Sequence, residues 1–398
     1  MNEVIKHALA WGIFSVAGSN RRVAAKLGDK VIDVLELALK GWFDDLDFDL
    51  TVFEKDTLND FISLGKGISN AVRERIESSS DFSEIRMYHE DDIELHLPVH
   101  IGDYTDFYSS EQHAYNVGVM FRDPDNALLP NWKHIPVGYH GRSSSIVVSG
   151  INFHRPKGQV NASDTTLPTF QATKRLDIEL EMATIIGKAT TLGQSISVDH
   201  AEAYVFGFAL FNDWSARDIQ RWEYVPLGPF LAKNFCSSMA PWIVPIEALE
   251  PFRVKKGRQV PKVLDYLDDP NLSGFDVNLE VYLIPEGATE SYKIIHSNFN
   301  NLYWSVAQQI AHHTVNGCNI NVGDVLASGT ISGKNPKSFG SLLELSWGGK
   351  NPITLPNGQT RTFLEDGDTI ILKGFAEKDG YRVTFGEVKT TVLPSIPL

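Results

Sequence analysis

The sequence predicts a mainly β protein of the α+β class, in which a small N-terminal β domain precedes a much larger domain of short strands. Residues 12–37 have the pattern of strands joined by tight turns. Beyond residue 95, short apolar runs alternate with turns rich in glycine and proline, such as PVGYHGRSSS and ASGTISGKNP. Few units alternate strand, helix and strand, which disfavours a doubly wound parallel sheet and favours a mostly antiparallel one.

The N-terminal elements follow from turn residues and apolar periodicity. GIFSV, VAAKL and KVIDVLEL predict strands, and the Gly28-Asp29 turn joins the last two into a hairpin. Between about residues 57 and 77, apolar residues recur every four positions, as on one face of a helix. A polar run then leads to IELHLPV. We therefore predict an N-terminal β domain with a helical connector over residues 1–95, and a second domain over residues 96–398.

Helical signals in the second domain are short and few. They occur near residues 109–117, 215–223 and 304–316, and Gly317 closes the last of them. The rest of this domain is predicted to form strands and turns.

Composition and charge exclude several classes of function. The formal net charge of −14 over 398 residues argues against a nucleic-acid-binding protein, which would carry basic clusters. Two cysteines, Cys236 and Cys318, are too few for a disulfide framework and indicate a reducing compartment. The N-terminal residues lack the apolar core of a signal peptide, and no run approaches the ~20 apolar residues of a membrane helix. We therefore expect a soluble, cytosolic protein without membrane or nucleic-acid partners.

The stretch LDIELEM, residues 176–182, predicts a strand with an unusual face. Its apolar residues alternate with three carboxylates, Asp177, Glu179 and Glu181. Side chains two apart on a strand lie about 7 Å from each other, close enough to repel unless water or a cation intervenes. By itself the pattern favours a strand that faces solvent. If the carboxylates instead hold an ion, oxygen ligands without soft donors suit Ca²⁺ or Mg²⁺.

The stretch DYTDFYSSEQH brings an acid, a phenol and an imidazole close together in sequence. Asp106 and Tyr108 lie two apart in an extended segment, after which Ser109 and Gln112 have the spacing of a capping box. His113 falls in the first turn of the predicted helix, where the helix dipole disfavours the imidazolium and keeps the ring able to accept a proton. His113 alone is more often structural than catalytic in such a position.

Two further stretches carry candidate residues with open interpretations. The apolar strand VFGFALFND ends at Asp213, which either caps a helix or ligates a metal. Arg217 and Gln220 then lie three apart, on one side of a short helix. In SFGSLLELSW, Glu344 either lies on the exposed face of a strand or is a buried acid with a partner, because an unpaired buried charge is too costly.

Seven segments together resemble the fumarylacetoacetate hydrolase family, in order and over nearly the whole chain. They are IGDYTDFYSSEQHAYNVGVMFRD, LPNWKHIPVGYHGRSSS, LDIELEMA, NDWSARDIQRWEYVPLGPFLAK, HHTVNGCN, ASGTISG and FGSLLELSW. The resemblance implies an SH3-like N-terminal β-barrel, a C-terminal mixed β-roll and a homodimer. It also implies metal-dependent hydrolysis of a C–C bond in 4-fumarylacetoacetate, a diketo dicarboxylate, to fumarate and acetoacetate, the last step of tyrosine and phenylalanine catabolism.

The resemblance further implies a role for each matching residue. The metal ligands would be Asp106, Glu179, Glu181 and Asp213, for calcium, with Lys233 and Ser237 at a probable second site for magnesium. The catalytic residues would be His113 as base, its partner Glu344, and the oxyanion-stabilising Arg217, Gln220 and Lys233. The substrate contacts would be Tyr108, Arg122, Tyr139, Gln220, Tyr224 and Thr330. Asp177 is not among the ligands and would either support the site or face solvent.

One departure and two alternatives remain open. Family members have Gly-Thr where this chain has Cys236-Ser237. Serine keeps the hydroxyl, but the cysteine in place of glycine leaves undecided whether magnesium binds there. A related family member that hydrolyses, decarboxylates or isomerises another 2,4-diketo acid is the nearest alternative. A catalytically silent metal-binding protein would be expected to lack the base or the oxyanion donors, yet all of them are present.

Overall fold

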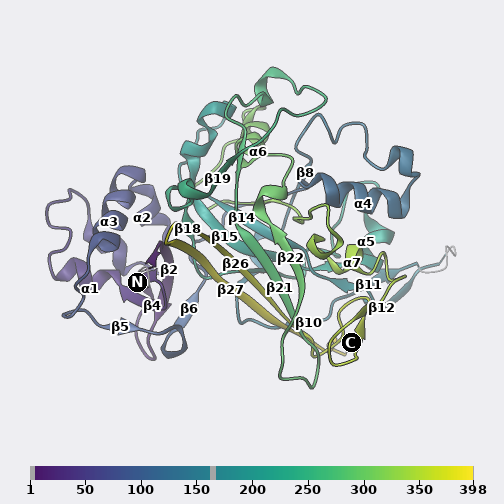
Figure 1. The fold of residues 1–398 in the computed structure, drawn as a ribbon, viewed down its shortest axis with the longest axis horizontal. Helices are drawn as coiled ribbons and strands as arrows, with labels where there is room; N and C mark the ends of the chain where they lie inside the picture. The colour runs from purple at the N-terminus through teal and green to yellow at the C-terminus, as the bar shows by residue number, and fades with distance from the viewer. Residues whose placement is uncertain (1–4, 162–166, 398) are drawn as a thin grey trace.

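The computed structural model describes residues 5–161 and 167–397. A small N-terminal part, purple in Figure 1, lies beside a much larger C-terminal part built mainly of strands. The predicted fold class, a small β domain followed by a large mixed α+β domain dominated by strands, is confirmed. No helix within the described ranges has the length and apolarity needed to cross a membrane.

The N-terminal part is a five-stranded antiparallel sheet covered by helices. In spatial order its strands are β5 (Met87–Tyr88), β4 (Lys30–Asp33), β3 (Arg22–Leu27), β2 (Leu9–Ser15) and β6 (Glu94–His96). Its helices are α1 (Val34–Leu39), α2 (Asn59–Ser63) and α3 (Lys66–Ser78). Because β6 is the last strand of this sheet, we propose that the domain boundary follows it.

Strand β2 is buried along its whole length because it faces two cores. Leu9, Trp11 and Ile13 pack in the core that the N-terminal helices share with the nearest sheet of the C-terminal part, whereas Ala10 and Phe14 pack in the main C-terminal core. This division follows from the two-residue period of a strand. A backbone bridge also joins β2 to Ile243 of the C-terminal part.

The predicted strand over residues 30–37 is wrong in its second half. The strand ends at Asp33, whose side chain accepts hydrogen bonds from the backbone N–H groups of Leu35 and Glu36 and so begins helix α1. The helix predicted between 57 and 77 is confirmed as the pair α2 and α3, separated at Gly65, which has a φ of 84°.

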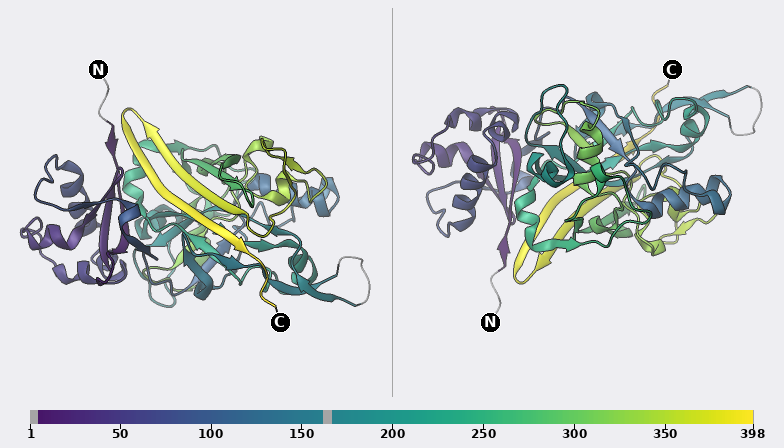
Figure 2. Two further views of the ribbon diagram at one scale, coloured as in Figure 1. Left: turned by 90° about the horizontal axis from the view of Figure 1, so that it is seen from below. Right: turned by 90° about the horizontal axis from the view of Figure 1, so that it is seen from above.

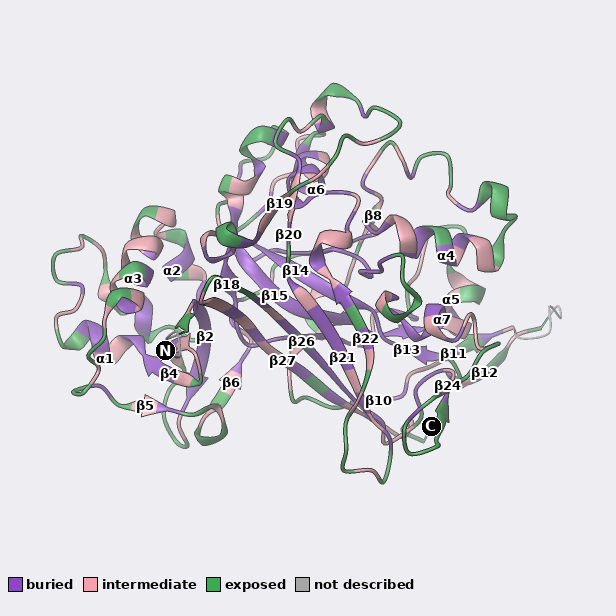
Figure 3. Cartoon of the chain, in the orientation of Figure 1, coloured by how far each residue is buried: buried purple, intermediate pink, exposed green. Residues whose placement is uncertain are grey.

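Two large sheets form the frame of the C-terminal part, and four two-stranded sheets add to them among the described residues. The first has the order β8–β7–β23–β14–β15–β17–β9, with β18 also paired to β15. Its strands are β8 (Gly138–His140), β7 (Tyr104–Phe107), β23 (Val325–Ala327), β14 (Leu180–Ile186), β15 (Val205–Asp213), β17 (Ser237–Met239), β9 (Ile146–Val148) and β18 (Val244–Pro245). Every residue of β14 and β15 is buried, and both strands are purple in Figure 3. Most pairs are antiparallel, as predicted, but β7 with β23 and β9 with β17 are parallel.

The second sheet has the order β1–β27–β26–β21–β22, with β10 also paired to β27. Its strands are β1 (Lys6–His7), β27 (Tyr381–Leu393), β26 (Thr369–Lys378), β21 (Asn278–Ile284), β22 (Tyr292–Asn298) and β10 (Phe153–His154). Figure 2 shows β26 and β27, in yellow, as one long hairpin across the C-terminal part. Its turn places Asp379 and Gly380 at positive φ, the conformation that two-residue hairpin turns favour.

Four helices of the C-terminal part are relevant to the site. They are α4 (Glu111–Phe121), α5 (Arg217–Glu223), α6 (Val306–Thr314) and α7 (Leu342–Leu345). The first three confirm the predicted helical segments to within a few residues. The fourth was not predicted as a helix: Ser341 caps it by accepting a hydrogen bond from the backbone N–H of Glu344.

Candidate active site and metal centre

Four carboxylates from three strand segments converge at one end of the first sheet. Asp106 lies on β7, Glu181 on β14 and Asp213 at the end of β15, while Glu179 lies just before β14. All four are buried, and each contributes one oxygen to a group in which all of the oxygens lie within 4.8 Å of one another. The sequence separates these residues by as many as 107 positions, and the order β7–β23–β14–β15 brings them together.

The stretch LDIELEM does not face solvent. It forms β13 (Leu176–Asp177) and the start of β14, and all seven of its residues are buried. Asp177, with 0% exposure, accepts hydrogen bonds from the guanidinium of Arg217 and from the backbone N–H groups of Leu342 and Leu343. The prediction of a solvent-facing strand was wrong, and so was the option that Asp177 faces solvent; it supports Arg217 and the start of α7.

Two cations lie against the cluster on one side. Arg217 Nη1 lies 2.7 Å from Glu179 Oε1, and Lys233 Nζ lies 2.7 Å from both Glu179 Oε2 and Asp213 Oδ2. Burial alone would raise the pKa of Glu179, but Lys233 and Arg217 hold it well below its ordinary value. Glu179 is therefore ionised near neutral pH.

The other side of the cluster lacks cationic partners among the described residues. Burial, followed by the neighbouring carboxylates, raises the pKa values of Asp106 and Glu181 well above their ordinary range. One oxygen of each, Asp106 Oδ1 and Glu181 Oε1, is buried without a hydrogen-bond donor among the described residues. Unpaired buried carboxylate oxygens are costly, and hard divalent cations take oxygen ligands of this kind. The residues present therefore fit a divalent metal ion.

A buried imidazole–carboxylate pair lies at the start of α4. His113 Nδ1 lies 2.7 Å from Glu344 Oε2, and only 3% of His113 is exposed. The N-cap of α4 is Ser110, whose hydroxyl accepts a hydrogen bond from the His113 backbone N–H. The predicted capping box of Ser109 with Gln112 was therefore wrong by one residue, although His113 does lie in the first turn.

Glu344 is surrounded by hydrogen-bond donors. The interpretation as a buried acid with a partner is therefore confirmed, and the alternative, a position on the exposed face of a strand, is wrong. The hydroxyls of Ser332 and Ser341 donate to its Oε2, and Asn116 Nδ2 donates to its Oε1 at 2.8 Å. Burial would raise the pKa of Glu344, but His113 and these donors hold it below its ordinary value. The carboxylate is thus ionised and can accept the proton of His113 Nδ1–H in a hydrogen bond.

Asn116 was missed by the sequence analysis. It lies three residues after His113 on the same helix, so both side chains reach Glu344 from one face of α4. Gln112 Nε2 donates to Asn116 Oδ1 and fixes the orientation of the amide. The sequence signal that could have found Asn116 is its position three residues after the candidate base, on the same face of the predicted helix.

Comparison with known proteins identifies the family. The family model described as "Fumarylacetoacetase N-terminal" matches residues 7–98, and the one described as "Fumarylacetoacetate (FAA) hydrolase C-terminal" matches residues 103–393. The chain belongs to the fumarylacetoacetate hydrolase family.

Relatives of this family resemble the chain from end to end. It is 48% identical to fumarylacetoacetase of Homo sapiens, covering 98% of this chain and 96% of that protein, and 46% identical to fumarylacetoacetase of Arabidopsis thaliana, covering 98% and 95%. Among solved structures, a fumarylacetoacetate hydrolase from Exiguobacterium antarcticum superposes with a TM-score of 0.57 at 19% identity, covering 97% of this chain and all of that one. The structural likeness supports the fold.

The residues that are expected to stabilise the oxyanion lie beside the carboxylate cluster. Arg217 Nη1 donates to Gln220 Oε1 at 3.2 Å, one turn along α5. Arg217 Nη2 is buried and has no acceptor among the described residues. Arg217 and the Lys233 ammonium therefore place positive charge against Glu179 and Asp213.

The expected substrate contacts divide into two groups. Three lie in the site: the Tyr108 ring meets the His113 ring edge-on at 5.2 Å, Tyr139 donates to Asp213 Oδ2 at 3.2 Å, and the Thr330 hydroxyl is buried without a partner among the described residues. Arg122 and Tyr224 are exposed at the ends of α4 and α5, the latter by 54%. Arg122 donates to the Ala127 carbonyl.

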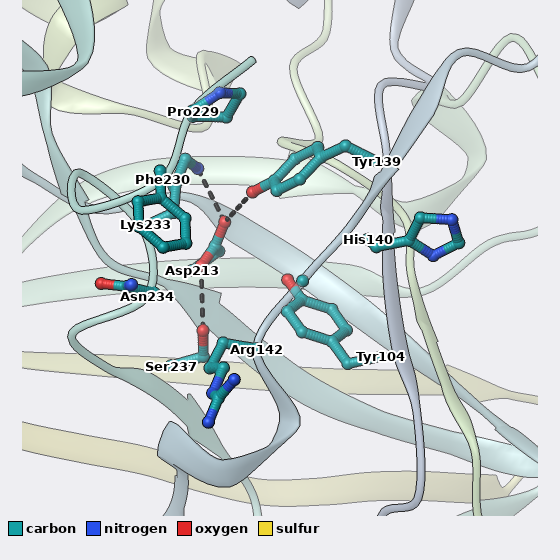
Figure 4. Close-up of a pocket in the computed structure, with 11 residues that line it drawn as sticks. Tyr104, Tyr139, His140, Arg142, Asp213, Pro229, Phe230, Lys233, Asn234 and Ser237 are labelled. Carbon is teal, nitrogen blue, oxygen red and sulfur yellow. Dashed lines mark hydrogen bonds and ion pairs between the residues drawn. The ribbon is translucent and has the colours of Figure 1, made fainter. Parts of the chain in front are cut away.

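A cavity of about 220 Å³ adjoins the cluster around Asp213. Figure 4 shows Lys233 and Tyr139 directed at one oxygen of this carboxylate, while Ser237 donates to the other at 2.9 Å.

An ammonium cannot ligate a cation, so Lys233 could contribute to a magnesium site only through its main-chain carbonyl. Burial raises the pKa of Cys236 to about 12, which makes its thiol a neutral group.

Proposed function

We propose that this chain hydrolyses a C–C bond of 4-fumarylacetoacetate to release fumarate and acetoacetate, the closing step of tyrosine and phenylalanine catabolism. The observation that carries the proposal is the buried His113–Glu344 pair beside the cluster of four carboxylates, in a chain that is 46–48% identical to proteins named fumarylacetoacetase. A general base can activate water for attack on a ketone, and a metal cation can polarise the ketone oxygen.

His113 is the proposed base. With its Nδ1–H donated to Glu344, the Nε2 lone pair is free to take a proton from water as the water attacks the carbonyl carbon. The ionised Glu344 fixes this tautomer and stabilises the imidazolium that forms. The proton is then available for the departing carbanion of acetoacetate.

Arg217, Gln220 and Lys233 are the proposed donors to the tetrahedral oxyanion. A preorganised donor of this kind is typically worth about 3–4 kcal/mol in the transition state. Asp106, Glu179, Glu181 and Asp213 would hold the divalent ion; their carboxylate oxygens suit Ca²⁺ or Mg²⁺, and we propose Ca²⁺ because the family resemblance implies calcium at these positions. When bound, such an ion supplies Lewis-acid stabilisation of charge on substrate oxygens.

Three further features are proposed from family membership. Lys233, through its main-chain carbonyl, and Ser237, which donates a hydrogen bond to Asp213, would form part of a Mg²⁺ site. The active form would be a homodimer, and its compartment the cytosol. Sedimentation analysis of the pure protein would test the dimer.

Removal of the metal is expected to stop catalysis reversibly. Adding pure protein to 4-fumarylacetoacetate should abolish the ultraviolet absorbance of the substrate, a chelator should prevent this, and Ca²⁺ or Mg²⁺ in excess should restore it. Chelator already saturated with Ca²⁺ serves as the control. Full activity in exhaustive chelator would contradict the metal role, and release of CO₂ in place of fumarate would identify a related decarboxylase instead.

Replacing Asn116 by alanine is expected to lower kcat by about tenfold, because supporting hydrogen bonds of this kind are typically worth 10–100-fold. Without Asn116, Glu344 Oε1 would lose its hydrogen-bond donor, and the carboxylate would no longer be held in one orientation toward His113. Steady-state kinetics measure the effect, and thermal melting checks the fold. Asn126→Ala, at an exposed position in the short 3-10 helix Pro124–Asn126 that follows α4, is the matched control. An unchanged kcat in Asn116→Ala would remove Asn116 from the site.

A further inference from the structure

Tyr104 is a buried tyrosine of β7, two residues before Asp106, with 4% exposure. Its ring lies 5.4 Å from the ring of Phe211 on β15. On another side lies Gly141, where a Cβ would stand 2.2 Å from two atoms of the Tyr104 ring. Only glycine permits this approach, so backbone and ring packing together fix the direction of the phenol.

The Tyr104 hydroxyl points into the cavity beside Asp213. Figure 4 shows it directed toward the space between Asp213 and Tyr139. The hydroxyl is buried, yet it makes no hydrogen bond to any described group of the protein. Three other donors around this cavity, on Tyr139, Lys233 and Ser237, all donate to Asp213.

A donor that is held rigidly, buried and unpaired calls for an acceptor from outside the chain, because burying an unsatisfied polar group is costly. The nearby acceptors of the protein are carboxylates, which repel an anionic ligand unless donors oppose them. We propose that the Tyr104 hydroxyl donates a hydrogen bond to an anionic oxygen of the bound substrate or product. This inference rests on the proposed function and adds a specificity-determining residue to it.

Tyr104→Phe tests the proposal, because it removes the hydroxyl and keeps the ring against Phe211 and Gly141. Binding of fumarate and of acetoacetate is measured separately by calorimetry at saturating Ca²⁺, and binding of Ca²⁺ is measured without either. We expect the affinity for at least one of the two carboxylates to fall about tenfold, the size expected for one hydrogen bond to a charged group. The Ca²⁺ affinity should change by less than about twofold, and KM should rise.

Two results would overturn the proposal. Unchanged affinity for both carboxylates would mean that the hydroxyl pairs only with solvent, and an equal loss of Ca²⁺ affinity would assign it to the surroundings of the ion. Tyr303→Phe is the matched control, because it also removes a hydroxyl without a partner among the described residues, from a ring packed against Trp132 and Trp304. It should bind both carboxylates like the unaltered protein.

Failure of the proposed function is distinguishable from failure of this inference. If the unaltered protein does not hydrolyse 4-fumarylacetoacetate but binds a carboxylate through Tyr104, the function is wrong and the inference holds. If the unaltered protein hydrolyses it and Tyr104→Phe binds both carboxylates equally well, the inference alone is wrong.

Discussion

Replacement of His113 by alanine is expected to lower kcat by about 10³-fold, within the range that a positioned general base supplies. Without the imidazole no group accepts the proton of water, and Glu344, held by three donors from Asn116, Ser332 and Ser341, cannot take over. The metal content should be unchanged, because His113 does not belong to the carboxylate cluster. Stopped-flow decay of substrate absorbance and elemental analysis of the metal measure the two quantities.

A double variant sharpens this test. If His113 and Glu344 act as one unit, His113→Ala with Glu344→Gln should be no slower than His113→Ala alone, since the effects of residues that act together are not additive. The exposed His200→Ala serves as the control and should retain full activity. A residual rate above about a tenth of the original in His113→Ala would exclude it as the base.

Replacement of Glu181 by glutamine is expected to weaken divalent-metal binding by about 100-fold or more. Two observations support this size: Glu181 Oε1 has no hydrogen-bond donor among the described residues, and Oε2 accepts a single hydrogen bond from them, donated by the Gly329 backbone N–H at 3.0 Å. Without metal, the variant should be at least as stable as the original, because burial and the neighbouring carboxylates disfavour the charged form of Glu181, which glutamine cannot adopt. Calorimetric titration with Ca²⁺ and thermal melts with and without Ca²⁺ measure both effects.

Asp177→Asn is the matched contrast, with the same change of charge in the same stretch. Asp177 accepts hydrogen bonds from Arg217 and from three backbone N–H groups, so its loss should lower the melting temperature with and without metal. Its effect on Ca²⁺ affinity should be much smaller. If Asp177→Asn weakened Ca²⁺ binding as much as Glu181→Gln did, the assignment of the ligand set would be wrong.

Local sequence patterns predict the helices and strands but not the contacts between them. The apolar run that ends at Asp213 and the short helix that begins at Arg217 could be predicted, because each depends on neighbours in sequence. Residues 34–37 could not be distinguished from a continuing strand, since the outcome depends on how the Asp33 side chain bonds two backbone N–H groups. The resemblance to the family placed Glu344 with His113, but periodicity could not, because 231 positions separate them.

Supporting groups were the hardest to predict. Asp177 and Glu179 both alternate with apolar neighbours, yet Asp177 accepts from backbone N–H groups at the start of α7 and Glu179 accepts from Lys233. Asn116 looks like an ordinary polar residue of a helix until α7 is placed beside it. Such roles depend on tertiary neighbours, which no local pattern records.

The division of β2 between two cores has a consequence for the chain as a whole. Because Trp11 and Ile13 pack in a core that includes Phe211 on β15, the strand that ends at Asp213, the small domain cannot melt without exposing the scaffold of the catalytic centre. The two domains should therefore lose structure in one transition. Sequence changes far from the active site, in the first hundred residues, would then act on the amount of working enzyme in a cell and leave the chemistry of each surviving molecule untouched.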